Sequence, residues 1–368
     1  MEAALHALSF VVGVALVVVT VVAAIRGTVL PRAVPSRINR VPAIAVRSVF
    51  RFRANRSASY ETRDRIMAML GPISLLAQLA TWLLLIMVGY TLMYLAVTDR
   101  SLTRSVELSG SSIFTLGTTS DPHLGPLLLT YTEAGLGLLL LALLITYLPS
   151  IYGAFTRRES GVALLQVRAG NPPRATNLLI RYHRIEESNY RLTELWRTWE
   201  AWFADIEESH TTFPILAFFR SPQPERSWIT SAGALLDGAS FWAGAIEHPK
   251  DPDVQLCLRA GTLALRRIAD VFRVPYNPDP APDDPISVSR LEWDDAVVEM
   301  KAAGVEMRDD REQAWKAWKG WRVNYDEVLL NLARLIEAPP APWVSDRSPI
   351  SASPRRRALL RGPPRTDV

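Results

Sequence analysis

Three long apolar segments constrain this 368-residue chain more than any other feature of its sequence. They run from Leu5 to Ile25, from Leu70 to Val97 and from about Leu124 to Phe155. The shortest has 21 residues, and at a rise of roughly 1.5 Å per helical residue it spans about 30 Å, the thickness of a bilayer core. Apolar residues are concentrated before Phe155 and charged residues after it, which indicates a membrane part joined to a soluble part.

The first segment can be a membrane anchor or a cleaved signal peptide. Glu2 is acidic where a signal peptide carries basic residues, and the apolar stretch is long for a signal sequence. Ala23-Ala24-Ile25-Arg26 is also a poor cleavage site. These features favour an anchor over residues 1–26.

Arginine distribution predicts the topology. From Arg26 to Arg65 there are ten arginines, no lysine and two acidic residues, so the positive-inside rule places residues 27–65 in the cytoplasm. The amino terminus then lies outside, the second segment runs outward, and the third returns to Arg157 and Arg158 on the cytoplasmic side.

Aromatic residues of the second segment are interpreted in part as anchors at the membrane surface. They are Trp82, Tyr90 and Tyr94.

A short polar stretch separates the second and third segments. Residues 98–123 are too few and too polar for another crossing, and Val106 to Phe114 is predicted to be a short helix with Ser and Gly on one side. Backbone groups at membrane depth need partners, so a non-helical turn there must be buried in protein or line a water-filled path. A re-entrant hairpin fits this length, and the alternative is an extracellular loop with a surface helix.

The residues after this helix carry a family resemblance. Thr115-Leu116-Gly117, with the flanking spans over residues 70–155, resembles the two-helix pore module of the potassium-channel superfamily. Its filter reads Thr-Val-Gly-Tyr-Gly-Asp, and filter carbonyls replace the hydration shell of potassium. Here Thr118 and Thr119 follow, so the second glycine is lost, and Asp121 stands one place later than the family's acid.

The resemblance implies a selectivity filter at Thr115, Leu116, Gly117, Thr118 and Thr119, with Asp121 at the pore mouth, in a homotetramer. A β-branched Thr119 disfavours the backbone conformation that glycine allows, so fewer carbonyl rings and weak discrimination between potassium and sodium are expected. The filter is similar to the Thr-Ile-Gly-Glu-Thr of non-selective cyclic-nucleotide-gated channels. An anion pore ranks third, because Arg100 and Arg104 are the only basic residues at the mouth.

The third segment holds four candidates for gating. Glu133 is an ionisable residue inside a span, which is a functional candidate by default or else a structural hydrogen-bonding partner of Ser109 or Ser112. Gly135 and Gly137 are each a hinge or a site of close helix packing. Pro149 is expected to kink or end the helix.

Beyond Arg158 the sequence is predicted to form a helical cytoplasmic domain over residues 157–343. Expected helices cover residues 175–210, 227–246, 254–272, 288–303 and 311–337, with a linker at 170–173 and a loop at 275–285. Trp315, Trp318 and Trp321 form a stripe that is either core or a ligand groove. The region from Glu292 to Trp343 resembles the carboxy-terminal domain of uncharacterised bacterial channel-like proteins.

Residues 344–368 are rich in Arg, Pro and Ser and are predicted to be a disordered tail, in which Arg355-Arg356-Arg357 can touch anionic lipid or remain solvated.

Several functional classes are disfavoured. The single Cys257 rules out an intrachain disulfide framework and a cysteine-based zinc site, and the five histidines lack metal-ligand spacing. No catalytic triad, Walker loop or dinucleotide-binding glycine motif appears, so no enzyme and no cofactor are expected. A net charge of +4 gives no reason to expect nucleic acid.

We therefore expect an all-α membrane protein with three transmembrane helices, one re-entrant pore helix and filter loop, and a cytoplasmic α-helical domain. The pore module comprises residues 66–156. The expected protein is a multi-pass subunit of a homotetrameric, weakly selective channel for potassium and sodium in a bacterial inner membrane, regulated through its cytoplasmic domain. The alternative is a non-conducting scaffold whose cytoplasmic domain binds a ligand or protein partner.

Overall fold

The computed structural model describes residues 2–28, 37–54, 60–98, 101–119, 121–185, 190–248 and 251–348. Over these residues the chain forms helices, with one isolated β-bridge between Ile246 and Met307 and no strand. It divides into two compact units, Met1–Gly153 and Ala154–Val368, close to the boundary expected after residue 156.

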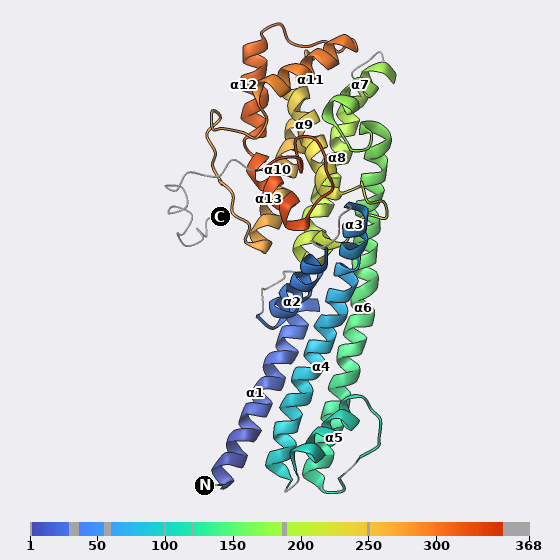
Figure 1. Ribbon diagram of the computed structural model, residues 1–368, viewed down its shortest axis with the longest axis vertical. Coiled ribbons are helices and arrows are strands. Elements are labelled where there is room, and N and C mark those ends of the chain that lie inside the picture. The colour runs from blue at the N-terminus through green and yellow to red at the C-terminus, as the bar shows by residue number, and fades with distance from the viewer. Residues whose placement is uncertain are drawn as a thin grey trace. The chain divides into compact units, whose positions relative to one another are not determined.

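The first unit contains the three predicted spans as helices (Figure 1). They are α1 (Glu2–Thr28), α4 (Leu70–Val97) and α6 (Leu124–Ala169). Each is long and apolar enough to cross a membrane, and the candidate span that contains α4 is counted from Tyr60 to Val97. Three candidate membrane spans are thus present, as the hydropathy of the sequence predicts.

Pro149 was expected to kink or end the third helix, and the structure excludes the second of these outcomes. The helix continues through Pro149 and Phe155 to Ala169. Beyond the proline, the residues Ala154, Val162 and Leu165 are buried at helical spacing. Proline has no backbone N–H to bond to the preceding turn. The packing of these buried residues stabilises the helix beyond Pro149 despite that missing hydrogen bond.

α1 packs against α4 through facing glycines. A Cβ atom on Gly13 would lie 2.5 Å from the carbonyl oxygen of Gly89, and one on Gly89 would lie 2.7 Å from a methyl group of Val17. The Ser9 hydroxyl also donates to the Leu92 carbonyl at 2.9 Å. Small residues allow this approach of two membrane-type helices, and such close packing fits an anchor.

The predicted cytoplasmic loop at 27–65 contains two helices, α2 (Arg37–Ala54) and α3 (Tyr60–Ala68). Asn39 attaches α2 to both neighbouring spans. Its side-chain amide donates to the Ala23 carbonyl of α1 at 2.9 Å, and its Oδ1 accepts from the indole N–H of Trp82 in α4 at 3.1 Å. This segment is therefore ordered against the bundle at the described residues.

Trp82, Tyr90 and Tyr94 are buried, which corrects their interpretation as surface anchors. The Tyr90 hydroxyl donates to the Thr132 hydroxyl of α6 at 3.0 Å. That of Tyr94 lies 3.1 Å from the Thr130 hydroxyl. Because a buried phenol needs a polar partner, these rings turn toward α6.

The second unit is a helical bundle around α9 (Trp228–Gly244), whose residues are buried on almost every side. Its other helices are α7 (Ala175–Ile185), α8 (Tyr190–Thr212), η1 (Pro214–Phe218), α10 (Pro252–Phe272), α11 (Arg290–Ala302), α12 (Arg311–Arg322) and α13 (Asp326–Ile336). α7, α10, α12 and α13 contact α9 directly. The predicted helices at 227–246, 254–272 and 288–303 are confirmed, as are the turn at 170–173 and the loop at 275–285.

The tryptophan stripe belongs to the core. Trp318 is fully buried, and Trp315 and Trp321 pack partly buried against the same cluster. The Trp318 ring lies 5.3 Å from that of Phe241 in α9 and 5.7 Å from that of Trp343. The core interpretation of the stripe is thus confirmed.

Within the predicted helix at 175–210 the structure describes α7 and α8, and residues 186–189 between them lie outside the described part. The other long predicted helix is two helices in the structure. Residues 311–337 form α12 and α13, because the Asn324 side-chain amide donates to the Gly320 carbonyl at 2.8 Å and completes the end of α12.

The predicted tail begins later than residue 344. Val344 is buried, and the Arg347 guanidinium lies 2.9 Å from the Glu292 carboxylate. Residues 344–348 therefore pack on the helical unit. The rest of the predicted tail, including Arg355-Arg356-Arg357, lies outside the described residues.

Arg157 and Arg158 differ in environment. Arg157 is exposed and pairs with Asp205 at 2.9 Å, whereas Arg158 is 1% exposed. The Arg158 guanidinium donates to the carbonyl oxygens of Leu216 and Phe219, each at 2.8 Å. Arg158 thus holds the segment from Leu216 to Phe219 against α6, a role that its charge alone does not predict.

Candidate functional site

A short helix, α5 (Leu102–Ile113), lies beside α4 and α6 in the first unit (Figure 1). It confirms the predicted helix at 106–114 and begins one turn earlier, where Ser101 accepts from the Arg104 amide at 3.4 Å. Its buried side is formed by four serines together with Leu108 and Ile113. Small side chains let this helix approach its neighbours closely.

The carboxy-terminal part of α5 contacts the middle of both neighbouring spans. The Ser109 hydroxyl donates to the Met87 carbonyl of α4 at 3.0 Å, ten residues or about 15 Å from the end of α4 at Val97. A Cβ on Gly137 of α6 would lie 2.3 Å from the Ile113 carbonyl oxygen. Gly137 is 13 residues, about 20 Å, from the start of α6.

The loop after α5 leaves helical geometry at the predicted filter. Thr115 and Gly117 have φ angles of 52° and 67°, in the left-handed region. For threonine this conformation is uncommon, and for glycine it is accessible. Phe114 to Thr118 are exposed in the single chain, with Leu116 at 63%.

Ser111 organises the second half of this loop. Its hydroxyl accepts from the Thr119 amide and from the Thr118 hydroxyl, each at 3.2 Å. The Ser111 carbonyl accepts from the Leu116 amide at 2.8 Å. Ser111 was not among the residues predicted from the sequence, although the run Ser109-Gly110-Ser111-Ser112 is a signal that could have identified it.

Glu133 makes the contact predicted for a structural residue. It is fully buried, and its Oε1 accepts from the Ser109 hydroxyl at 2.5 Å. The Tyr94 hydroxyl also lies beside the Glu133 carboxyl group. The same hydroxyl is 3.3 Å from the Ser112 hydroxyl. The predicted hydrogen bond to Ser109 is confirmed, and Glu133 thereby joins α5 to α6 behind the loop.

The two glycines of α6 have different surroundings. Gly137 is buried against Ile113, so it meets the expectation of close packing. Gly135 is exposed, and no atom lies within 4 Å of a Cβ built on it. A hinge at either glycine stays a prediction, and so does a gating role for Pro149 within the continuous α6.

Asp121 is buried in the single chain, whereas an acid at an open pore mouth would be exposed. It is 4% exposed, and its Oδ1 accepts from the His123 amide at 3.0 Å. The same oxygen lies 2.7 Å from Nδ1 of His123. Asp121 therefore shapes the turn that leads into α6.

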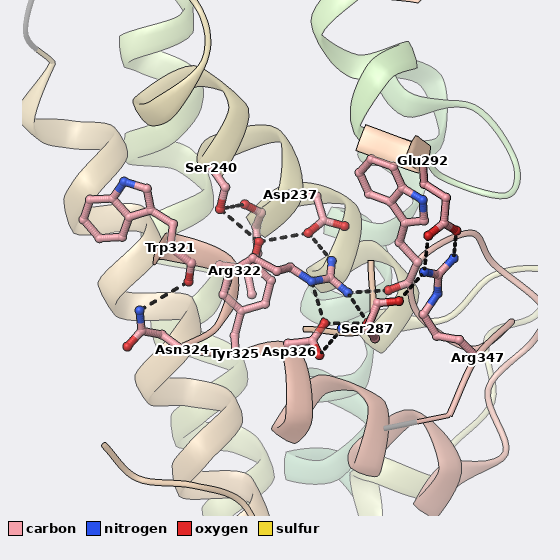
Figure 2. Close-up of polar contacts among 12 residues, drawn as sticks. Asp237, Ser240, Ser287, Glu292, Trp321, Arg322, Asn324, Tyr325, Asp326 and Arg347 are labelled. Atoms are coloured by element: carbon pink, nitrogen blue, oxygen red, sulfur yellow. Dashed lines mark hydrogen bonds and ion pairs between the residues drawn. The ribbon is translucent and has the colours of Figure 1, made fainter. Parts of the chain in front are cut away.

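The second unit contains a buried ionic cluster that the sequence analysis did not predict. Figure 2 shows the Arg322 guanidinium between the carboxylates of Asp237 and Asp326. Its Nε lies 2.8 Å from Asp326, and its Nη2 donates to the Trp343 carbonyl at 2.6 Å. The Tyr325 hydroxyl donates to Asp237 at 2.9 Å. The cluster joins α9, α12, α13 and the carboxy-terminal segment.

Electrostatics in this cluster favour a permanently charged arginine. Burial alone would lower the pKa of Arg322, but Asp237 and Asp326 raise it above its ordinary value. Burial raises the pKa of Asp237, and the positive charge of Arg322 opposes that rise. Breaking such a pair leaves an uncompensated buried charge, so the cluster fixes how these helices pack.

Arg158 is a second buried cation in this unit, and it lies next to a histidine. His210 is fully buried, and its Nε2 lies 3.5 Å from the Arg158 guanidinium. Burial, and then the charge of Arg158, lower the pKa of His210 well below its usual value. His210 is therefore neutral at pH 7.

No group of three or more His, Cys, Asp or Glu residues that could hold a metal ion occurs within the described residues. Cys257 is a buried free thiol. The candidate site is the α5 helix together with the loop that follows it.

Comparison with known proteins identifies a membrane-protein relative. The chain is 24% identical over 242 residues to the uncharacterized membrane protein YdjJ of Bacillus subtilis strain 168, an alignment that covers 62% of this chain and 69% of that protein. No family model matches the chain. No solved structure matches it either. This similarity and the three apolar helices indicate a membrane location.

Proposed function

We propose that the chain is a subunit of a homotetrameric, weakly selective channel for potassium and sodium, with residues 115–119 as the narrow part of the path. The observation that carries this proposal is the depth of α5 along its neighbours. The Ile113 carbonyl meets Gly137 about 20 Å along a helix that is long enough to cross a bilayer core of about 30 Å.

This depth distinguishes a re-entrant helix from a surface helix. A surface helix would contact only the ends of α4 and α6, whereas Ser109 bonds to Met87 and Glu133 well inside both. The loop that follows is irregular and exposed in the single chain. Irregular backbone at such depth is tolerated where it is buried in protein or lines water, and neighbouring subunits around an axis supply both conditions.

The direction of α5 favours cations over anions. Its carbonyl end is at Ile113, next to Thr115, and the carbonyl end of a helix carries a partial negative charge. The only basic side chain described on α5 is Arg104, which pairs with Glu107 at 2.6 Å at the opposite end. A cation at the loop is therefore favoured electrostatically.

Weak selectivity follows from the second half of the loop. The Thr118 hydroxyl and the Thr119 amide donate to the Ser111 hydroxyl. That hydroxyl also lies 3.5 Å from the Thr119 carbonyl oxygen, so this carbonyl turns toward α5. Fewer backbone carbonyls are then available to replace the hydration shell of an ion, and discrimination between potassium and sodium is expected to be small.

The same contact also favours the second candidate function, a non-conducting membrane scaffold. In that case Ser111 closes the loop against α5, and the helical second unit binds a ligand or protein partner. The two functions predict opposite results in a flux measurement.

The test is reconstitution of the full chain into liposomes with separate potassium, sodium and chloride gradients, after cross-linking has established the tetramer. The proposal expects potassium and sodium flux of similar size and no chloride flux. The absence of flux from folded tetramers in every gradient would exclude the channel and favour the scaffold.

Gly117→Ala provides the matched variant for the filter. The φ of 67° at Gly117 is costly for alanine, so the variant should assemble normally and lose conduction. Unchanged flux in this variant would show that Gly117 does not lie at the constriction.

A further inference from the structure

α2 has an unusual composition for a helix next to membrane spans. Its 18 residues contain five arginines and neither aspartate nor glutamate. The rest is mostly apolar, with Asn39 and Ser48 as the exceptions. This combination of apolar and cationic residues is typical of helices that lie in the surface of a membrane.

The apolar residues of α2 form a stripe on its exposed side. Val41, Ala45, Val49 and Phe52 recur at helical spacing, and all four are exposed. Val41 and Val49 are each 65% exposed, and Phe52 is 62% exposed. An apolar stripe of this kind needs a cover, because it is unfavourable in water.

Arginines flank this stripe on both sides. At 100° per residue, Arg40 falls on one edge of the exposed face and Arg53 on the other, and both are exposed. The helix thus presents an apolar centre with cationic borders. That pattern matches a lipid surface, in which anionic headgroups surround apolar chains.

The attachment of α2 gives its level along the bundle. Asn39 bonds to the Ala23 carbonyl, five residues before α1 ends at Thr28, and to Trp82 of α4. Arg26 follows Ala23 within the last turn of α1 and marks the end of its apolar stretch. α2 is therefore held at the level where a bilayer that contained α1 would have its headgroups.

We propose that α2 lies in the headgroup layer of an anionic bilayer, with Val41, Ala45, Val49 and Phe52 inserted toward the acyl chains and the flanking arginines on lipid phosphates. The chemistry of the stripe and the absence of acids in α2 select this partner. A soluble partner protein, or a second copy of the chain, would have to cover the same stripe and would supply its own counter-charges.

Spin labelling of the full chain tests this proposal. Nitroxides are attached through Val41→Cys or Val49→Cys, in a Cys257→Ala background, in nanodiscs of phosphatidylglycerol. Val19→Cys on the exposed side of α1 is the control for lipid, and Val298→Cys on the exposed side of α11 is the control for water. The measurement is the accessibility of each nitroxide to oxygen and to a water-soluble nickel chelate.

The proposal expects both α2 labels to resemble Val19 in high oxygen and low nickel access. Labels that match Val298 would overturn it. Strong dipolar broadening between labels of neighbouring chains, together with low oxygen access, would assign the stripe to a protein interface and would equally overturn it.

The role of the arginines is measured separately with Arg40→Gln and Arg53→Gln. Each arginine near an anionic surface is worth about a fivefold change in partitioning, so the double variant should hold the helix on the lipid about 25-fold less strongly. Nickel access at the α2 label should rise in this variant, and also in the labelled chain with both arginines intact when the nanodiscs are phosphatidylcholine. Access that ignores both lipid charge and arginine loss would refute the proposed phosphate contacts.

Discussion

Gly137→Ala is the substitution that most directly tests how α6 positions the loop. The new Cβ would lie 2.3 Å from the carbonyl oxygen of Ile113 and 3.2 Å from its carbonyl carbon. A carbon and an oxygen in contact are normally separated by about 3.3 Å, so the end of α5 must move by about 1 Å. Overpacking of this kind costs about 1–3 kcal/mol, which lowers the population of the native arrangement roughly 5- to 150-fold.

Gly135→Ala is the matched control, two residues away on the same helix. Nothing lies within 4 Å of its added Cβ, and alanine stabilises a helix by up to about 1 kcal/mol relative to glycine. If the chain is the proposed channel, liposome flux assays normalised to the amount of tetramer should show that Gly137→Ala loses most of the cation flux and that Gly135→Ala retains it.

Equal flux in the two variants, at the level of the unsubstituted chain, would refute this reasoning. It would mean that the contact between Ile113 and Gly137 does not set the position of the loop. A loss of flux in Gly135→Ala alone would instead indicate that the exposed side of α6 is packed in the proposed tetramer.

Two further predictions concern the second unit, which holds all but one of the 11 tryptophans and can be followed by their fluorescence during denaturation. Arg322→Met leaves Asp237 and Asp326 without a buried counter-charge and should lower the free energy of unfolding by about 3–5 kcal/mol. Asp237→Asn should lower it less, because Asp326 still pairs with Arg322. Equal losses in the two variants would contradict this asymmetry. Burial and the charge of Arg158 lower the pKa of His210 in the folded state. Below about pH 6.5, the ordinary pKa of histidine, the unfolded chain therefore takes up a proton at His210 that the folded chain does not. The free energy of unfolding should then fall by about 1.4 kcal/mol per pH unit. His210→Gln should remove that slope, and an unchanged slope would assign it to other groups.

The three spans and the short helix between them could be predicted from sequence because each depends on local composition. α4 has the bounds predicted for it, from Leu70 to Val97, because hydropathy and length determine a membrane-type helix. The bond between Glu133 and Ser109 could also be predicted, since an ionisable group in a span requires a polar partner nearby.

Features that depend on side chains distant in sequence could not be predicted in this way. Asn39 reads as an ordinary polar residue of a loop, yet it bonds to both α1 and α4. Arg322 and Asp237 are 85 residues apart, so no local pattern relates them. Tyr325, at the break between α12 and α13, donates to the same Asp237, which is again distant from it in sequence.

The distribution of polarity on α5 limits where an ion could pass. Ser105, Ser109 and Ser112 are buried, and the bonds of Ser109 run to α4 and α6. The exposed polar side chains of α5 all lie in its first half, at Thr103, Arg104 and Glu107. Beyond Glu107 the side chains of α5 therefore offer no hydrated path, and in the proposed channel the backbone of residues 115–119 is the polar surface left to line one. The position of that loop therefore decides whether the proposed channel conducts. Gly137→Ala should shift Ile113 by about 1 Å to relieve the contact of the new Cβ with the Ile113 carbonyl oxygen. This shift should affect conduction more strongly than substitutions on the outer face of α5.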